Sequence, residues 1–312
     1  MRVFDLHCDT IMEIYRNDKK LDNNDLHIDL NKLKLGNYLV QCFAMFVPSV
    51  LKDSFSVCNE MIDKLEMEAK RCGIDILYDN KVKGLSGILT IEDAGCLNGS
   101  IEKLHHFYKR GVKMIGLTWN FVNEVGYPNF VLKKDETPDF KTPDVLNGLT
   151  ECGIDIVKEM DRLGMLVDVS HLSDKGFYDV ASIVKGPFVA SHSNCRSICP
   201  HVRNLTDDMI RVLSSHGGIM GINYCTDFVN ENEKETKISD LVKHIRHAVE
   251  IGGIDCVALG SDFDGIPHTL EMKDSSELDK LYNALKPYFT DEEIEKIFYK
   301  NALRVFKLEF ID

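Results

Sequence analysis

Stretches that would enter or cross a membrane are missing from this sequence of 312 residues. No run approaches the ~20 apolar residues of a membrane-spanning helix, and the opening residues lack the apolar core of a secretory signal. Basic residues are also few, 37 against 50 acidic ones, which leaves a net charge of −13. Such a surface does not attract phosphate backbones or anionic lipid headgroups. We therefore expect a cytoplasmic protein whose partner is a small molecule rather than a nucleic acid or a membrane.

Closely spaced cysteines are scarce as well. The ten cysteines are scattered along the chain, and only Cys195 and Cys199 form a C-x-x-x-C pattern. A structural zinc ribbon would need a second close pair, and a disulfide framework is typical of short secreted chains. We therefore expect reduced, buried thiols, and we interpret Cys195 and Cys199 as ordinary residues rather than metal ligands.

A bias toward disorder is missing too. Hydrophobic residues make up 44% of the chain and charged residues 28%, which is typical of globular proteins. Because the length suffices for one large core, we expect a single domain over residues 1–312.

The sequence does contain a strand, helix, strand unit between Met165 and Asn194. Two short apolar runs each end in a polar cluster with a histidine, His171 in Asp-Val-Ser-His and His192 in Ser-His-Ser-Asn. The segment between them has the length of a crossover helix, so the strands should be parallel neighbours with both histidines at their carboxyl edge. That edge binds ligands and metals in parallel α/β proteins. One histidine there is usually structural, but two at equivalent positions predict metal ligands.

A His-x-Asp pattern, His7 and Asp9, follows the first apolar run of the chain. Alternate residues of a strand face the same side, so both side chains can bind one ion. A second copy, His27 and Asp29, precedes a Leu- and Lys-rich segment instead of closing an apolar strand. We therefore interpret the second copy as a surface or structural feature.

Two further strand ends carry carboxylates. Glu92 follows the apolar run 87–91 and is placed to bridge two cations, although a Glu-Asp pair also suits helix capping. Asp262 follows the apolar run 256–260. The only tryptophan, Trp119, ends another strand at the same edge, where a packing role would be sufficient.

Eight strand-like segments alternate with helical ones, at 3–6, 38–47, 87–91, 113–118, 165–167, 187–190, 219–224 and 256–260. This alternation, over a length that accommodates a ~250-residue barrel with insertions, predicts a (β/α)8 TIM barrel. Histidines and carboxylates then fall on one rim: His7, Asp9, Glu92, His171, His192 and Asp262. Three histidines with these carboxylates are enough for two zinc ions bridged by a carboxylate, and manganese or cobalt would suit the same ligands.

Two loops near this rim are candidates for substrate contact. The loop after Asn194 contains Arg196 and Arg203, and an arginine that points into the pocket would bind a carboxylate through two hydrogen bonds. Residues 121–142 form the longest segment without clear periodicity. A loop of this length in a compact domain is typically a pocket wall or a lid.

Amphipathic patterns predict helices over residues 147–163 and 240–251. His244 and His247 lie one turn apart on the second of these helices. Because this helix is peripheral to the predicted rim, we interpret both histidines as surface or groove residues.

The assembled motifs resemble the membrane dipeptidase (renal dipeptidase) family of zinc peptidases, within the amidohydrolase superfamily. The resemblance spans nearly the whole chain, through His-Cys-Asp-Thr, Ile-Glu-Asp-Ala, Gly-Met-Leu-Val-Asp-Val-Ser-His-Leu-Ser, Ser-His-Ser-Asn, Arg-Asn-Leu-Thr-Asp and Gly-Ser-Asp-Phe-Asp-Gly. It implies hydrolysis of dipeptides by a pair of zinc ions, and family members often form homodimers. The implied roles are one zinc on His7 and Asp9, the other on His171 and His192, a bridging Glu92, a catalytic acid at Asp262 and a grip on the substrate carboxylate by Arg203.

The sequence departs from the family at one position that contacts substrate. Well-studied mammalian members carry a histidine just after the fourth-strand Leu-Thr, where this chain has Trp119. This departure concerns transition-state stabilisation and substrate preference rather than metal binding. The mammalian enzymes are also secreted, lipid-anchored and disulfide-linked, and this sequence carries none of those signals.

Other functions stay open on the sequence. The same barrel supports lactam, lactone or deaminase chemistry, because a fold does not decide a function; Glu92 on strand three and no obvious bridging lysine on strand four favour the dipeptidase. A non-catalytic metal-binding relative is a further alternative, against which the intact Asp262 argues. A purely structural role for every rim residue would require many coincidences.

Overall fold

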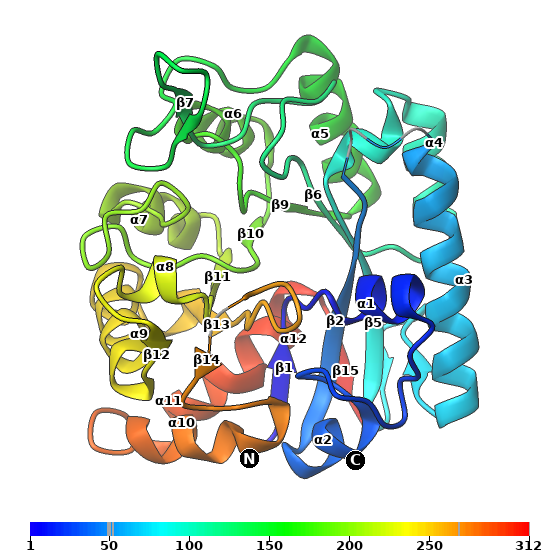
Figure 1. The fold of residues 1–312 in the computed structure, drawn as a ribbon, viewed down its shortest axis with the longest axis vertical. Coiled ribbons are helices and arrows are strands. Elements are labelled where there is room, and N and C mark those ends of the chain that lie inside the picture. Colours follow the sequence, from blue (N-terminus) through cyan, green and yellow to red (C-terminus); the bar gives the residue numbers. More distant parts are fainter. Residues whose placement is uncertain (49–50, 52, 268, 312) are drawn as a thin grey trace.

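The computed structural model describes residues 1–48, 51, 53–267 and 269–311. Strands lie on the inside and helices on the outside of the molecule, and both chain ends lie at the bottom of the view in Figure 1. The strands of the inner ring are β1 (Val3–Asp5), β2 (Tyr38–Phe46), β5 (Ser86–Glu92), β6 (Met114–Gly116), β9 (Leu166–Asp168), β10 (Val189–Ala190), β11 (Ile219–Ile222) and β13 (Val257–Leu259). Each of them overlaps one of the segments predicted from the sequence.

The ring of strands is closed. Hydrogen bonding follows the order β2-β1-β13-β11-β10-β9-β6-β5, and β5 pairs again with β2. All of these pairings are parallel. Because each strand lies beside the strand that precedes it in the chain, this topology confirms the predicted (β/α)8 barrel.

The strands are apolar on both faces because helices cover the barrel and side chains fill its interior. Residues 86–92 of β5 are all buried, and adjacent residues such as Ile88 and Leu89, which face opposite sides, are both completely inaccessible to solvent. Near-continuous apolar runs are typical of parallel strands buried on both faces. This is why short runs, rather than alternating patterns, marked the strands in the sequence.

The helices form the outer layer. They are α1 (Thr10–Asn17), α2 (Leu30–Leu35), α3 (Ser54–Cys72), α4 (Ile101–Lys109), α5 (Glu151–Leu163), α6 (Asp174–Ile183), α7 (Asp207–Ser215), α8 (Thr226–Val229), α9 (Ile238–Gly252), α10 (Leu278–Leu285), α11 (Asp291–Glu295) and α12 (Asn301–Val305). Several of them, α2, α4, α5, α6, α7 and α11, begin at a short polar residue whose side chain caps the helix. The expected start of α5 at residue 147 was wrong, because the Thr150 side chain accepts a hydrogen bond from the Gly153 N–H and caps the helix there. A π-helical segment, Lys296–Lys300, joins α11 to α12.

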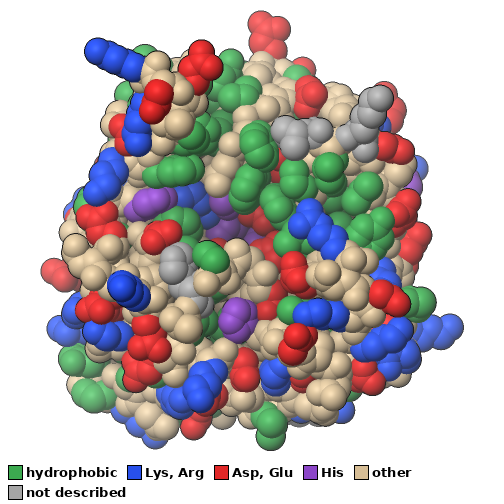
Figure 2. Space-filling view, viewed as in Figure 1, with side chains coloured by type: hydrophobic (Ala, Val, Ile, Leu, Met, Phe, Trp, Pro, Cys, Tyr) green, Lys and Arg blue, Asp and Glu red, His purple; other side chains and the backbone are tan. Residues whose placement is uncertain are grey.

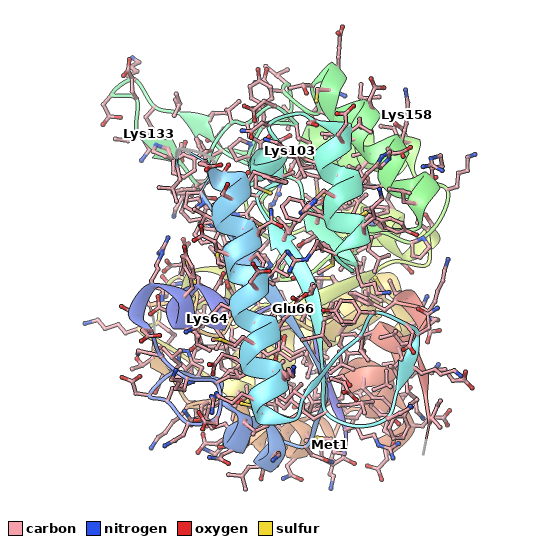
Figure 3. All side chains as sticks on the ribbon, turned by 90° about the vertical axis from the view of Figure 1, so that its right-hand side faces the viewer. Met1, Lys64, Glu66, Lys103, Lys133 and Lys158 are labelled. Atoms are coloured by element: carbon pink, nitrogen blue, oxygen red, sulfur yellow. The ribbon has the colours of Figure 1, made fainter. Side chains whose placement is uncertain are left out.

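Small additional strands decorate the barrel. The loop at residues 121–142, whose sequence shows no clear periodicity, contains an antiparallel pair of strands, β7 (Val131–Leu132) and β8 (Pro138–Asp139). Figure 3 shows Lys133 on this hairpin, which projects away from the barrel wall formed by α3 and α4. Other short pairs are β3 (Asp75–Ile76) on β5, β4 (Lys81–Val82) with β15 (Glu309–Phe310), and β12 (Glu235–Thr236) with β14 (Thr269–Leu270).

Two expectations about the chain as a whole can be compared with this structure. All ten cysteines are free. Eight of them are buried, as expected, whereas Cys72 and Cys152 are partly exposed. Cys195 and Cys199 are both buried, and neither belongs to the metal-ligand clusters described below. Among the described residues, no helix is both long enough and apolar enough to cross a membrane.

Candidate active site

Polar side chains gather where the barrel strands end. Glu92 is the last residue of β5, and His7 follows β1 by two positions. His171 and His192 follow β9 and β10, and Asp262 follows β13. The five side chains that were predicted as metal ligands are His7, Asp9, Glu92, His171 and His192, and all of them are buried. The parallel barrel therefore brings together predicted ligands that are up to 185 positions apart, from His7 to His192.

One half of the site is formed by His7, Asp9 and Glu92. The Nε2 atom of His7 lies 3.6 Å from Asp9 Oδ2 and 3.3 Å from Glu92 Oε2. Within the described part of the chain, neither this nitrogen nor Asp9 Oδ1 has a hydrogen-bond partner, although both are buried. Unpartnered polar atoms are costly in a protein interior. Their convergence on carboxylates fits a site for a cation.

The other half is formed by Glu92, His171 and His192. Glu92 Oε1 lies 3.0 Å from His171 Nε2 and 3.6 Å from His192 Nε2. Since its second oxygen faces His7, Glu92 lies between the two halves with one oxygen toward each. This is the arrangement expected of a carboxylate that bridges two metal ions, and each set offers three ligand atoms to an ion.

Hydrogen bonds to the far side of the His171 and His192 imidazoles orient their Nε2 lone pairs toward the centre. The Nδ1 atom of His171 lies 2.9 Å from the Asn120 side-chain oxygen, which can only accept. The Nδ1 atom of His192 lies 2.7 Å from the Ser191 hydroxyl, which itself donates to Asp168. Both rings therefore carry their proton on Nδ1, and their Nε2 atoms are free to bind a metal.

Burial and neighbouring charges strongly shift the pKa values of the residues in the first half of the site. Burial, together with the neighbouring Glu92 carboxylate, raises the pKa of Asp9 to about 8. Burial also opposes ionisation of Glu92, but the imidazoles of His7 and His171 outweigh it and hold the pKa of Glu92 well below its usual range. For His7, burial lowers the pKa, yet Glu92 and Asp9 prevail and raise it. Without a bound cation, these carboxylates compete for the few positive charges nearby.

The imidazoles of the second half are held neutral. Burial lowers the pKa of His171 to about 3, and the nearby positive charge of Arg203 acts in the same direction. Burial, together with His7 and Arg203, also lowers the pKa of His192 far below its usual range. Neutral imidazole is the form that binds metals, so these environments favour ligation.

Asp262 lies at the edge of the site, with its side chain 13% exposed. Its Oδ2 atom accepts a 2.9 Å hydrogen bond from Asn223, and its Oδ1 atom lies 3.9 Å from His7 Nε2. Burial raises the pKa of Asp262 to about 6, so this carboxyl can exchange a proton near neutral pH. A side chain at Gly265 would collide with this carboxylate and with Asp9, because a Cβ atom there would lie 2.0 Å from Asp9 Oδ2.

Arg203 is almost completely buried behind the second half of the site. One of its Nη atoms donates to the backbone oxygen of His192 at 3.3 Å, and its guanidinium lies 5.3 Å from the Phe228 ring. Its Nε atom has no partner among the described residues. A buried guanidinium with an unused donor fits a site for a carboxylate.

Arg196, the other arginine of this loop, has a structural position instead. Its guanidinium makes two 2.7 Å hydrogen bonds with the carboxylate of Asp174 at the start of α6. It also donates to the backbone oxygens of Val202 and Asn204, on either side of Arg203. Arg196 therefore holds the loop that presents Arg203 to the site.

The site opens into a cavity of about 250 Å³, with Trp119 in its wall. The centre of the Trp119 ring lies 6.1 Å from that of the His171 imidazole. Figure 2 shows a hollow on this face, with histidine and basic side chains at its floor and hydrophobic side chains beside it. Trp119 therefore lines the same cavity as Glu92 and His171, and its contact with substrate stays a prediction. The hairpin within residues 121–142 is absent from the residues that line this cavity in the described structure, so the prediction of a wall or lid gains no support.

Sequence reasoning missed the residues that orient the ligands. Asn120, Asp168 and Asn223 each follow or close a barrel strand, so the same rule that found the histidines would have found them. The interpretation of His244 as a surface or groove residue was wrong. This imidazole is fully buried, where its Nδ1 accepts from the Cys195 N–H and its Nε2 faces the Val229 oxygen. The second His-x-Asp pattern is structural, since Asp29 caps α2 and His27 contacts Asp264.

A closed (β/α)8 barrel with histidines and carboxylates converging over its strand ends defines a metal-dependent hydrolase, and comparisons with known proteins agree. The family model described as membrane dipeptidase (peptidase family M19) matches residues 1–311. The chain therefore belongs to the membrane dipeptidase family of metallopeptidases.

Individual relatives cover most of the chain. An uncharacterised protein in the pqqA 5' region of Klebsiella pneumoniae is 37% identical over 270 residues, which are 83% of this chain and 95% of the relative. An uncharacterised dipeptidase of Schizosaccharomyces pombe is 30% identical over 306 residues, 90% of this chain and 72% of that protein. The crystal structure of a metallopeptidase from Rhodobacter sphaeroides, liganded with a phosphinate mimic of the dipeptide L-Ala-D-Ala, has a TM-score of 0.87 and 25% identity, over 98% of this chain and 99% of that one.

Proposed function

We propose that this protein hydrolyses the peptide bond of dipeptides with two zinc ions, one held by His7 and Asp9 and the other by His171 and His192. Glu92 would bridge the two ions. The observation that carries this proposal is the position of Glu92, whose two carboxylate oxygens face His7 at 3.3 Å and His171 at 3.0 Å. Nitrogen and oxygen ligands of this kind suit zinc, and also manganese or cobalt.

A zinc pair in this position would lower the pKa of water and polarise the peptide carbonyl. The residues of the chain supply the rest of the chemistry. Asp262, with a pKa of about 6, takes a proton from the attacking water and delivers it to the nitrogen of the leaving amino acid. Its hydrogen bond from Asn223 keeps the second carboxylate oxygen in place during this transfer.

Arg203 binds the C-terminal carboxylate of the substrate in this proposal. Its Nε donor is buried and unused, and a charged partner would satisfy it. The cavity of about 250 Å³ is below the ~300–1,000 Å³ of sites for drug-sized ligands. Both features favour very short peptides, and the dipeptide mimic bound by the Rhodobacter sphaeroides relative supports the same substrate class.

Hydrolysis of a pooled set of L-L and L-D dipeptides by the purified protein tests this function. We expect cleavage that disappears after chelation and returns with zinc, and parallel additions of manganese and cobalt would compare the metals. A protein that binds two metals per chain yet cleaves none of the dipeptides would contradict the proposal. That result would favour another amide, lactam or lactone substrate, or a non-catalytic relative.

Two expectations from the sequence stay predictions. We propose a cytoplasmic location, which fractionation of the source cells would test. We also propose a homodimer, which light scattering of the purified protein would test.

A further inference from the structure

The turn that carries Asp262 has a strained backbone. Asp262 and Asp264 both have positive φ angles, 62° and 68°, in the left-handed region that residues other than glycine adopt at a cost. The turn follows β13, and the Gly265 N–H donates to the main-chain oxygen of Asp262 at 3.1 Å. Such a conformation persists only where surrounding groups hold it. The position of the Asp262 carboxylate therefore depends on the contacts of this turn.

Asp264 anchors the turn to the N-terminal part of the chain. Its side chain is only 1% exposed, and its Oδ2 atom accepts a 2.6 Å hydrogen bond from the Thr10 hydroxyl at the start of α1. Its Oδ1 atom accepts from the His27 N–H, also at 2.6 Å. In Figure 1 the loop after β13, in orange, lies close to the blue N-terminal segment. Both oxygens of this carboxylate therefore bind residues that are 254 and 237 positions away in the sequence.

His27 completes this anchor with its side chain. Its Nδ1 atom lies 3.0 Å from the main-chain nitrogen of Asp264. Because a main-chain N–H can only donate, Nδ1 accepts this bond and the ring carries its proton on Nε2. The same Nδ1 atom lies 3.0 Å from Asp264 Oδ1, and the ring stacks on Phe263 with 5.2 Å between ring centres. His27 therefore contacts both residues that immediately follow Asp262.

His27 is itself held from outside the active site. Its main-chain oxygen accepts hydrogen bonds from the Ser275 N–H at 3.2 Å and from the Ser275 hydroxyl at 3.1 Å. Two residues further on, Asp29 caps α2 by accepting a 2.8 Å hydrogen bond from the Lys32 N–H. His27 is also outside the clusters of candidate metal ligands in the described part of the chain. The second His-x-Asp pattern thus forms a support, in which Asp29 fixes the segment and His27 reaches the turn.

We propose that His27 is a positioning residue for catalysis, which holds the backbone of Phe263 and Asp264 so that the Asp262 carboxylate stays in place for proton transfer. This inference rests on the proposed dipeptidase function, because it takes the role of Asp262 from it. A proton carrier must lie within hydrogen-bond reach of the atom that it protonates, and a displacement of about 1 Å can cost about 100-fold in rate. Without the acceptor on His27, the left-handed turn relaxes and moves Asp262.

Two substitutions of the same branched shape test this acceptor. His27→Asn keeps an acceptor oxygen near the position of Nδ1, whereas His27→Leu has no acceptor. We expect His27→Leu to lower kcat for dipeptide hydrolysis by roughly 10- to 100-fold, with little change in KM or in the metal content per chain. His27→Asn should recover most of this loss. His27→Ala replaces the leucine variant if that protein does not fold.

A double substitution tests whether His27 acts through Asp262. In the Asp262→Asn background the proton carrier is already missing, so His27→Leu should cause little further loss of kcat. Residues that act as one unit are not additive in this way. Full additivity of the two losses would show that His27 does not act through Asp262.

His216→Leu is the matched control. His216 is also partly buried, and its two ring nitrogens lie 2.9 Å from the Val212 oxygen and 3.1 Å from the Ala181 oxygen. It lies between α7 and β11, at the end of the barrel away from the candidate active site. Its replacement removes comparable contacts, and it should keep the wild-type kcat.

Amide hydrogen exchange provides a readout that does not depend on turnover. The amides of residues 262–265 should exchange faster in His27→Leu than in the wild type or in His27→Asn. A wild-type enzyme that cleaves no dipeptide contradicts the proposed function and, with it, a catalytic role of His27. Dipeptide cleavage with an unchanged kcat in His27→Leu, equal losses in the leucine and asparagine variants, or unchanged exchange of the turn contradicts only the inference.

Discussion

The Nε2 atoms of His171 and His192 lie 3.1 Å apart, although each ring carries its proton on the opposite nitrogen. The lone pairs of these two nitrogens therefore face each other, and Glu92 Oε1 lies 3.0 Å from the Nε2 atom of His171. The neighbouring Nδ1 contacts to Asn120 and Ser191 hold the rings in these positions. A cation bound between these atoms would stabilise this electron-rich centre.

Removal of the metal should therefore destabilise the fold. A ligand at about 100 times its dissociation constant stabilises the native state by ~2.7 kcal/mol, so chelation of two such ions should lower the melting temperature by roughly 8 °C. Calorimetry before and after chelation, and after return of zinc, measures this change. The melting temperature of the double variant, His171→Ala with His192→Ala, should change much less on chelation. Identical melting temperatures of the zinc-loaded and chelated wild-type protein would contradict a structural contribution of the metal.

Asp262→Asn should abolish proton transfer while preserving the site. The amide keeps an oxygen for the hydrogen bond from Asn223 but cannot take up a proton. We expect kcat to fall by ~10²–10⁴-fold with an unchanged metal content per chain. Asp255→Asn makes the same change at a carboxylate whose side chain is 65% exposed, and it should keep the wild-type rate. Normal turnover of the Asp262 variant would refute its assigned role.

Arg203→Met should remove recognition of the substrate carboxylate with little change in side-chain volume. A hydrogen bond to a charged group contributes ~1.5–3 kcal/mol, so kcat/KM for dipeptides should fall by roughly 10- to 150-fold. Dipeptide amides, which lack the carboxylate, should be poor substrates of the wild-type enzyme and should lose little more in the variant. Arg162→Met, at an arginine that is 65% exposed, provides the control. Equal discrimination against amides in wild type and variant would exclude this role of Arg203.

Stability should decrease in mild acid because of His244. Burial lowers its pKa to about 4, whereas an unfolded histidine titrates near 6.5. Between these two pH values the unfolded chain binds the proton more strongly than the folded one. The contribution of neutral His244 to the free energy of unfolding is therefore complete above about pH 6.5 and is lost as the pH falls toward 4. From pH 7.5 to 5 the free energy of unfolding should fall by ~2 kcal/mol because of this group.

Urea unfolding of the chelated protein at both pH values measures this effect. The variant His244→Gln removes the titrating group, and it should lose ~2 kcal/mol less than the wild type over this interval. Because the histidines of the active site titrate in both proteins, the difference isolates His244. An equal pH dependence of the two proteins would contradict the prediction.

Much of the barrel, and the gathering of the candidate metal ligands on one rim, could be predicted from the sequence because both depend on local patterns. Short apolar runs mark strands that are buried on both faces, and the closed ring then places the residues after each strand on one rim. His171 and His192 were recognisable for this reason. Gly73 ends α3 for a similarly local reason, because glycine accommodates the left-handed backbone there, with φ of 69°.

Predictions failed where the answer depends on neighbours that are distant in sequence. His244 lies on an amphipathic helix, and only the packing of that helix against Cys195 and Val229 buries it. The helices α1 and α2 are short and were not foreseen. Short helices depend mainly on tertiary contacts for their stability, so their sequence pattern is weak.

Local sequence patterns specify which residues end the strands and therefore which side chains meet at the rim. The partners of those side chains depend on tertiary contacts: Asn120 lies behind His171, Asn223 behind Asp262, and Phe46 beside Trp119. These contacts join separate strands and loops, whose distance depends on how the barrel closes. Periodicity and spacing describe one segment at a time, whereas the closed barrel brings these segments together.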